Sequence, residues 1–287
     1  MQIGVVFPQT ELGGSVDAVR AYALGVEDCG FSHLLAYDHV VGADPEVHSG
    51  WSGPYDVATT FHEPLVLFGY LAAITSLELV TGILILPQRQ TVLAAKQAAE
   101  VDLLTGGRFR LGVGIGWNAV EYEALGQRFD RRGRRLAEQV GLLRRLWTEP
   151  SFSFTGEFDT LTGAGINPLP VQRPIPVWMG GQADATYRRI GQLADGWFPQ
   201  VLPGDDLDHA RRAIAASARD AGRDPATIGM EGRVRVDLAD PDRFLRQVER
   251  WRAAGASHLS LDTMRAGLAD VTQHLAALRE AATLLGL

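Results

Sequence analysis

The stretch RFRLGVGIGWNAVEYEALG, residues 108–126, combines a strand-like apolar run with glycines at three alternate positions. Gly112, Gly114 and Gly116 fit either a dinucleotide-binding turn or a strand end that needs a bare backbone. The dinucleotide fingerprint requires its third glycine where this chain has Trp117. The spacing is therefore weak support for a nucleotide-binding turn. The choice between the two interpretations depends on the segments on either side of this stretch.

Short apolar runs alternate with longer segments of helical periodicity on both sides of this stretch. Eight runs predict buried strands, at 3–7, 33–37, 77–86, 108–116, 175–181, 195–199, 228–238 and 258–261. The segments between and after them predict helices at 15–30, 64–76, 91–107, 119–147, 184–194, 205–222, 240–255 and 268–285. Ser15 is the expected N-cap of the first helix and Gly30 its stop.

This alternation indicates a barrel. Repeated strand–helix units imply a parallel sheet, and eight of them favour a closed (β/α)8 TIM barrel over a doubly wound open sheet. We expect one domain over residues 1–287, with irregular excursions at 38–60, after the second strand, and at 150–174, before the fifth. Chemistry in such barrels lies at the C-terminal strand ends, where the glycine run stands.

The composition limits the partners. Hydrophobic residues make up 46% of the chain and charged residues 21%, and the formal net charge of −7 argues against nucleic acid or an anionic membrane as main partner. The sequence has no apolar run of bilayer length, and its N-terminus has neither a basic region nor a cleavage site, which predicts a cytoplasmic protein. Cys29 is the only cysteine, so neither an internal disulfide nor a thiolate metal cluster is expected.

The residues at the strand ends are the candidates for a functional site. They are Pro8, Gln9, Asp38, His39, Gly82, Ile83, Gly116, Trp117, Asn118, Gly180, Gly181, Trp197, Pro199, Asp237, Asp262 and Thr263. None has metal-ligand spacing, and no serine or cysteine stands beside a base, so we expect no metal. Glycine, tryptophan and amide groups favour binding of a large planar cofactor over unaided hydrolysis.

Asp38 and His39 are the best candidates for polar chemistry, because the near-neutral pKa of histidine suits proton transfer. The alternative is that Asp38 caps local backbone and His39 only packs in its loop. Trp51, Tyr55 and Trp197 are aromatic candidates for a substrate pocket, although such side chains also pack beneath loops.

Three segments resemble a known family. They are LVTGILILPQRQTVLAAKQAAEVDLLTGGRFRLGVGIGWNAVEYEALG (79–126), AYDHV (36–40) and PLPVQRPIPVWMGGQADATYRRIGQLADGWFP (168–199). They are similar to the luciferase-like oxidoreductases of the bacterial luciferase superfamily, above all to the branch that uses the deazaflavin coenzyme F420. The resemblance extends from the N-terminus to about Pro199 and weakens beyond it.

The resemblance implies hydride transfer between F420 and a small organic substrate with a C=C, C=N or carbonyl group. An FMN-dependent monooxygenase that uses reduced flavin and oxygen is the alternative, and a cofactor-binding barrel without turnover is a third interpretation. A homodimer is also implied, since the family commonly forms one through helices around the early strands.

The resemblance also implies a site. The cofactor would contact Asp38, Gly82, Ile83, Gly114, Gly116, Trp117, Asn118, Gly180 and Gly181. Gly180 and Gly181 precede a helix whose N–H groups suit a phosphate, with a plain turn as the alternative. Asp38 and His39 would be catalytic, and His39 would lie near the ring carbon that exchanges hydride. Arg89 and Arg173 are candidates for the anionic tail. A bulge with a non-proline cis peptide is implied at Gly82–Ile83.

Overall fold

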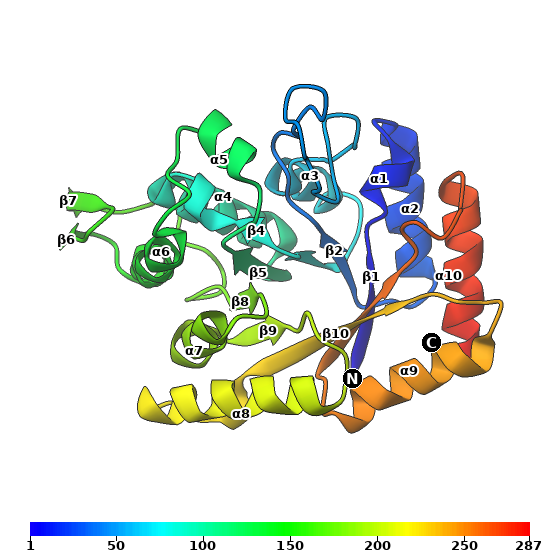
Figure 1. Cartoon of the computed structure of the whole chain (residues 1–287). Helices are drawn as coiled ribbons and strands as arrows, with labels where there is room; N and C mark the ends of the chain where they lie inside the picture. The colour runs from blue at the N-terminus through cyan, green and yellow to red at the C-terminus, as the bar shows by residue number, and fades with distance from the viewer.

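A closed barrel of eight parallel strands forms the centre of the protein, whose computed structural model describes residues 1–287 (Figure 1). The barrel strands are β1 (Gln2–Val6), β2 (His33–Ala36), β3 (Glu78–Thr81) continued by β4 (Leu84–Ile85), β5 (Phe109–Gly114), β8 (Val177–Gly180), β9 (Gly196–Phe198), β10 (Gly229–Arg235) and β11 (His258–Asp262). Neighbouring strands pair in parallel, and the pairing of β3 with β5 closes the sheet. The predicted TIM barrel is confirmed, and the open sheet is wrong.

Helices surround the barrel (Figure 1). They are α1 (Gln9–Leu12), α2 (Val16–Asp28), α3 (Pro64–Leu71), α4 (Thr91–Thr105), α5 (Ala119–Ala124), α6 (Arg132–Thr148), α7 (Asp184–Leu193), α8 (Asp205–Asp220), α9 (Pro241–Ala253) and α10 (Val271–Leu285). Ser15 caps α2 by accepting the Ala18 N–H, as predicted. No helix combines the length and the apolar character needed to cross a membrane.

Three segments differ from or refine the sequence prediction. The single helix expected at 119–147 is two helices, because the chain turns between them with positive φ at Gly126 and Arg131. The excursion at 150–174 contains an antiparallel hairpin of β6 (Phe152–Thr155) and β7 (Thr160–Ala164), set outside the barrel. The third barrel strand is interrupted at Gly82–Ile83, where the predicted non-proline cis peptide is confirmed.

A buried ion network fills the interior at the N-terminal side of the barrel. The Glu231 carboxylate accepts hydrogen bonds from the Arg110 guanidinium at 2.7 Å and from the Ser260 hydroxyl at 2.6 Å, and lies 3.1 Å from His33 Nε2. Arg110 also binds Glu78 at 2.9 Å. Burial opposes ionisation of Glu231, but Arg110 and His33 outweigh it and hold the pKa of this carboxyl well below its usual range.

We expect Glu231→Gln to destabilise the fold by about 2–3 kcal/mol at neutral pH, because Arg110 loses its closest buried carboxylate. A carboxyl with a lowered folded-state pKa contributes stability above its usual pKa of 4.5 and loses it as the pH falls. Urea unfolding of both proteins at neutral and acidic pH measures this. The difference should shrink in acid, and a constant difference would contradict the assignment.

Candidate functional site

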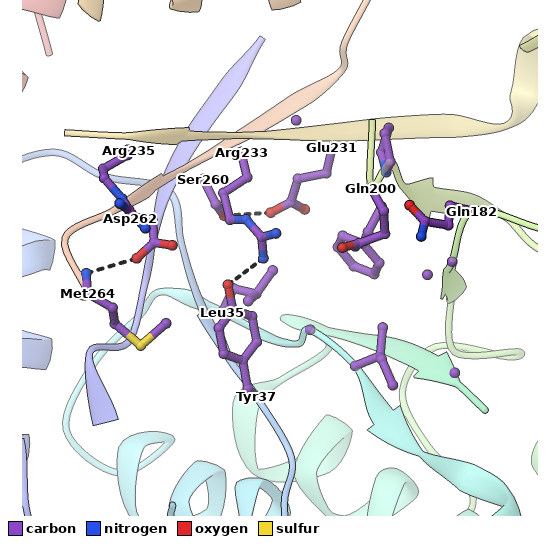
Figure 2. Close-up of a pocket in the computed structure, with 18 of the residues that line it drawn as sticks. Leu35, Tyr37, Gln182, Gln200, Glu231, Arg233, Arg235, Ser260, Asp262 and Met264 are labelled. Carbon is purple, nitrogen blue, oxygen red and sulfur yellow. Dashed lines mark hydrogen bonds between the residues drawn. The ribbon is translucent and has the colours of Figure 1, made fainter. Parts of the chain in front are cut away.

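A cavity of about 1270 Å³ opens at the C-terminal ends of the barrel strands. Leu35, Ile83, Phe198 and Met264 give it an apolar lining. Polar side chains from β10 and β11, and Gln182 and Gln200 from the loops after β8 and β9, complete the lining (Figure 2). The strand ends from which the sequence predicts the site therefore converge on one large space. Its volume is sufficient for a cofactor together with a small substrate.

In one wall of the cavity, glycines flank a single apolar side chain, that of Ile83. Ile83 projects from the interrupted third strand between Gly114 and Gly180, and all three line the cavity. A Cβ atom at Gly114 would lie 2.5 Å from Ile83 Cδ1, and one at Gly180 would lie 3.2 Å from Ile83 Cγ2. A side chain at Gly114 would displace Ile83, so the glycines leave room for Ile83 in the cavity wall, where its apolar surface suits a flat ring.

The chain after β8 offers backbone donors to the same cavity. Gly181 has φ +136°, which favours glycine, and it leads through Gln182 and Ala183 into α7. Ala183 caps the helix without a side-chain hydrogen bond, so the first N–H groups of α7 have no side-chain acceptor. These residues and Thr186 line the cavity. The arrangement suits the phosphate of a bound cofactor.

His39 lies on the cavity wall within a group of aromatic side chains. Its ring centroid is 4.7 Å from that of Phe61, 5.1 Å from that of Tyr55 and 5.5 Å from that of Trp117. Its Nδ1 is 3.5 Å from the Glu121 carboxylate, and its Nε2 has no hydrogen-bond partner in the protein. The ring is therefore held at one nitrogen and has the other free for a ligand.

Glu121, which the sequence prediction omits, fixes this part of the site. Its fully buried carboxylate accepts hydrogen bonds from the Val40 and Val41 N–H groups and from Gln88. Burial opposes ionisation, but these donors and His39 outweigh it and lower the pKa of Glu121. The groups that donate hydrogen bonds to it are 33 to 81 residues away in sequence, so no local pattern identifies it.

The Asp38 carboxylate is engaged within the protein, and its contact with the cofactor stays a prediction. One carboxylate oxygen binds Arg89 at 2.8 Å and the other accepts the Ile85 N–H at 2.9 Å. The side chain is completely covered, so Asp38 reaches the cavity only with its backbone. Burial raises the pKa of Asp38, partly offset by Arg89. By accepting the Ile85 N–H, Asp38 holds β4 in place. This role resembles the alternative given by the sequence, in which Asp38 caps local backbone.

Three further predicted residues do not line the cavity. Asn118 caps α5, with its side-chain oxygen accepting the Val120 and Glu121 N–H groups. Trp197 points outward from β9 and packs against Tyr187 of α7, because its neighbour Phe198 takes the inward position. Trp51 lies behind Trp117, with ring centroids 5.6 Å apart. Among the predicted pocket aromatics, Tyr55 alone lines the cavity.

The arginines proposed for the anionic tail are engaged elsewhere. Arg89 forms ion pairs with Asp38 and Glu63, at 2.8 and 2.9 Å. Arg173 precedes β8, at the opposite end of the barrel, and donates to the Pro170 carbonyl. Basic side chains reach the cavity from β10 and α9 instead. Gly82, Ile83, Gly114, Gly116, Trp117, Gly180 and Gly181 line the cavity where the sequence predicts the cofactor.

Residues 1–283 match the family described as luciferase-like monooxygenase. The chain belongs to this family. The family predicted from the sequence is thereby confirmed, and the match extends well past Pro199, where the resemblance of the sequence segments weakens.

Relatives in the family carry different cofactors in their names. An uncharacterized protein of Mycobacterium tuberculosis is 38% identical over 57% of this chain, and the match spans only 56% of that protein. The F420-dependent hydroxymycolic acid dehydrogenase of M. tuberculosis is 28% identical over 88% of this chain and 68% of its own length. The FMNH2-dependent dimethylsulfone monooxygenase of Pseudomonas putida is 35% identical over 48% of this chain and 39% of its own.

Solved structures of the luciferase-like fold superpose over nearly the whole chain. An F420-dependent secondary alcohol dehydrogenase bound to an F420–acetone adduct gives a TM-score of 0.80 at 16% identity, covering 99% of this chain and 98% of its own. A riboflavin lyase with modified FMN gives the same TM-score and identity, covering 100% and 92%. At such identity these likenesses show the fold alone.

Proposed function

We propose that this protein is an F420-dependent oxidoreductase that transfers hydride between the deazaflavin and a small organic substrate with a C=C, C=N or carbonyl group. The observation that carries the choice of cofactor is a basic groove joined to the cavity. The F420-dependent relative, which aligns with most of this chain, supports the same choice.

The groove has a volume of about 420 Å³ and runs along α9. Arg243, Arg246 and Arg250 line it from one face of that helix, since they are spaced by three and four residues. Leu202, Arg243 and Gln247 line both the groove and the cavity, so the two spaces are adjacent. F420 continues beyond its phosphate as an acidic tail, whereas FMN ends at its phosphate. A basic groove leading out of the cavity suits the longer cofactor.

Each part of the cavity has a function in this proposal. Ile83 supports the ring between the bare strands at Gly114 and Gly180, and the N–H groups after Gly181 hold the phosphate. Bound F420 would supply two-electron hydride chemistry at a ring carbon. His39 holds or receives a proton at Nε2, while Glu121 fixes its opposite nitrogen. The surrounding aromatic rings exclude water from this proton.

An FMN-dependent monooxygenase remains the second candidate, supported by the Pseudomonas relative. The ring wall and the phosphate site suit either cofactor, so they do not distinguish them. The groove on α9 supports F420, because FMN has no group to place in it.

Replacing Arg243, Arg246 and Arg250 together with glutamine should weaken F420 binding about tenfold, since each exposed charge pair contributes ~0.2–1 kcal/mol. Calorimetric titration with F420 and with FMN, at low and high salt, measures this. FMN affinity should be unchanged in the variant. The matched control is Arg219→Gln on the exposed face of α8. Equal losses for both cofactors would contradict a tail site.

A single domain over residues 1–287, a homodimer and a cytoplasmic location stay predictions from the sequence. Analytical ultracentrifugation of the purified chain tests the dimer directly, since a monomer at all concentrations would rule it out.

A further inference from the structure

Strand β10 directs a row of charged side chains into the cavity. Glu231, Arg233 and Arg235 occupy alternate positions, so all three face the barrel interior, while Val234 between them packs in the hydrophobic core on the outer side. Glu231 belongs to the buried ion network described above. The two arginines follow it along the strand, toward the C-terminal end of β10. Figure 2 shows Arg233 reaching across the cavity toward Tyr37.

Neither arginine is neutralised by the protein. Arg233 donates one hydrogen bond, to the Tyr37 hydroxyl, and its other N–H groups have no partner. Arg235 makes no ion pair or side-chain hydrogen bond, and both side chains are exposed to the cavity. Asp262 is the nearby acid; its carboxylate accepts the Met264 N–H and forms no ion pair within 4.0 Å. Burial raises the pKa of Asp262, and the nearby charges of Arg233 and Arg235 partly offset this. One carboxylate thus stands opposite two arginines.

Other charges around the cavity leave this excess in place. Asp38 is paired with Arg89, and Glu231 with Arg110. Arg265 adds a third cation at the rim, where its guanidinium lies over the Tyr55 ring, 5.1 Å from the centroid. A chain with a net charge of −7 thus directs unpaired cations into this cavity. Such a cavity attracts anions.

We propose that Arg233 and Arg235 bind the carboxylate of the substrate, so that this protein acts on a small organic acid with an apolar body. A guanidinium presents two parallel N–H groups that match a carboxylate. Leu35, Phe198 and Met264 line the same space and suit the apolar part of the molecule. The substrate class rests on the proposed function, whereas the binding site rests on the arginines alone.

An anionic group of the cofactor is the other source of this chemistry. The phosphate has backbone donors at Gly181 and α7, after β8, and the tail has the groove on α9. Arg233 lies on β10, two residues beyond Glu231 of the ion network, with Leu35 of the apolar lining near it. These positions assign the cofactor anions elsewhere and leave Arg233 for the substrate.

The test compares carboxylates with their neutral amides: benzoate with benzamide, cinnamate with cinnamamide and hexanoate with hexanamide. Each is titrated calorimetrically into the cofactor-free chain and into the chain saturated with F420. At least one carboxylate should bind about 10- to 100-fold more tightly than its amide, as expected for charge-assisted hydrogen bonds. Arg233→Gln and Arg235→Gln should each reduce this preference, and the double variant should abolish it, whereas Arg219→Gln should keep it.

Three results would overturn the proposal. The first is that no carboxylate is preferred over its amide, and the second is that the preference survives in the double variant. The third is that saturation with F420 removes the preference, which would assign the arginines to the cofactor. Failure of F420 to bind would refute the proposed function instead, and the cofactor-free titrations would still decide the carboxylate site.

Discussion

Replacing His39 with alanine is expected to slow hydride transfer about 10²–10⁴-fold, the usual contribution of a general acid or base. His39 lines the cavity, its Nε2 has no hydrogen-bond partner in the protein, and its Nδ1 lies 3.5 Å from Glu121. Cofactor affinity should change little, since the ring and phosphate contacts come from other strands. The single-turnover rate of reduced F420 oxidation, with an acceptor that the wild type reduces, measures the effect.

His39→Phe separates chemistry from packing. Phenylalanine keeps an aromatic ring among Tyr55, Phe61 and Trp117 but carries no proton. We expect it to be as slow as the alanine variant, and added imidazole to restore part of the rate only in His39→Ala. A phenylalanine variant with wild-type turnover would show that His39 is a packing residue.

Gly114→Leu is expected to weaken cofactor binding at least about 100-fold, since overpacking alone costs ~1–3 kcal/mol and each 1.4 kcal/mol is tenfold. Even a Cβ atom here would lie 2.5 Å from Ile83 Cδ1, and the rest of the leucine would extend into the space assigned to the ring. Equilibrium titration with F420 and FMN measures the loss. Both cofactors should be affected, because the ring wall serves either.

Gly141→Leu is the matched control for this substitution. Gly141 lies on the exposed face of α6, and no atom lies within 4 Å of a Cβ built there. Its thermal stability and cofactor affinity should stay close to those of the wild type. If Gly114→Leu folds and binds both cofactors normally, the ring does not lie against Ile83.

The barrel is predictable because its signals are local. Alternating apolar runs and helical segments identify every barrel strand, and glycines mark strand ends that approach a neighbour closely. Two predictions of secondary structure between the strands are incomplete, because the composition of these segments does not show where the chain turns. The helix expected at 119–147 breaks after Gly126, and the hairpin at 150–174 lies in a segment rich in glycine and proline. Neither the helix break nor the hairpin alters the positions at which the barrel strands end.

The site is predictable only in part, because side-chain direction depends on partners far away. β9 has three residues, too few for alternation to show that Phe198 faces inward and Trp197 outward. Asn118 stands directly before α5, and asparagine is a preferred N-cap residue, so its capping role is predictable from the local sequence. The alternation of Glu231, Arg233 and Arg235 is also visible in the sequence. Glu121 depends on tertiary contacts alone.

Titrating the purified chain with F420 and with FMN tests the central proposal most directly. The cavity and its basic extension along α9 predict micromolar or tighter binding of F420 that weakens as salt screens the tail arginines. FMN, which has nothing to place in the groove, should bind at least about tenfold more weakly. Tight binding of FMN with no binding of F420 would contradict the account and favour the monooxygenase.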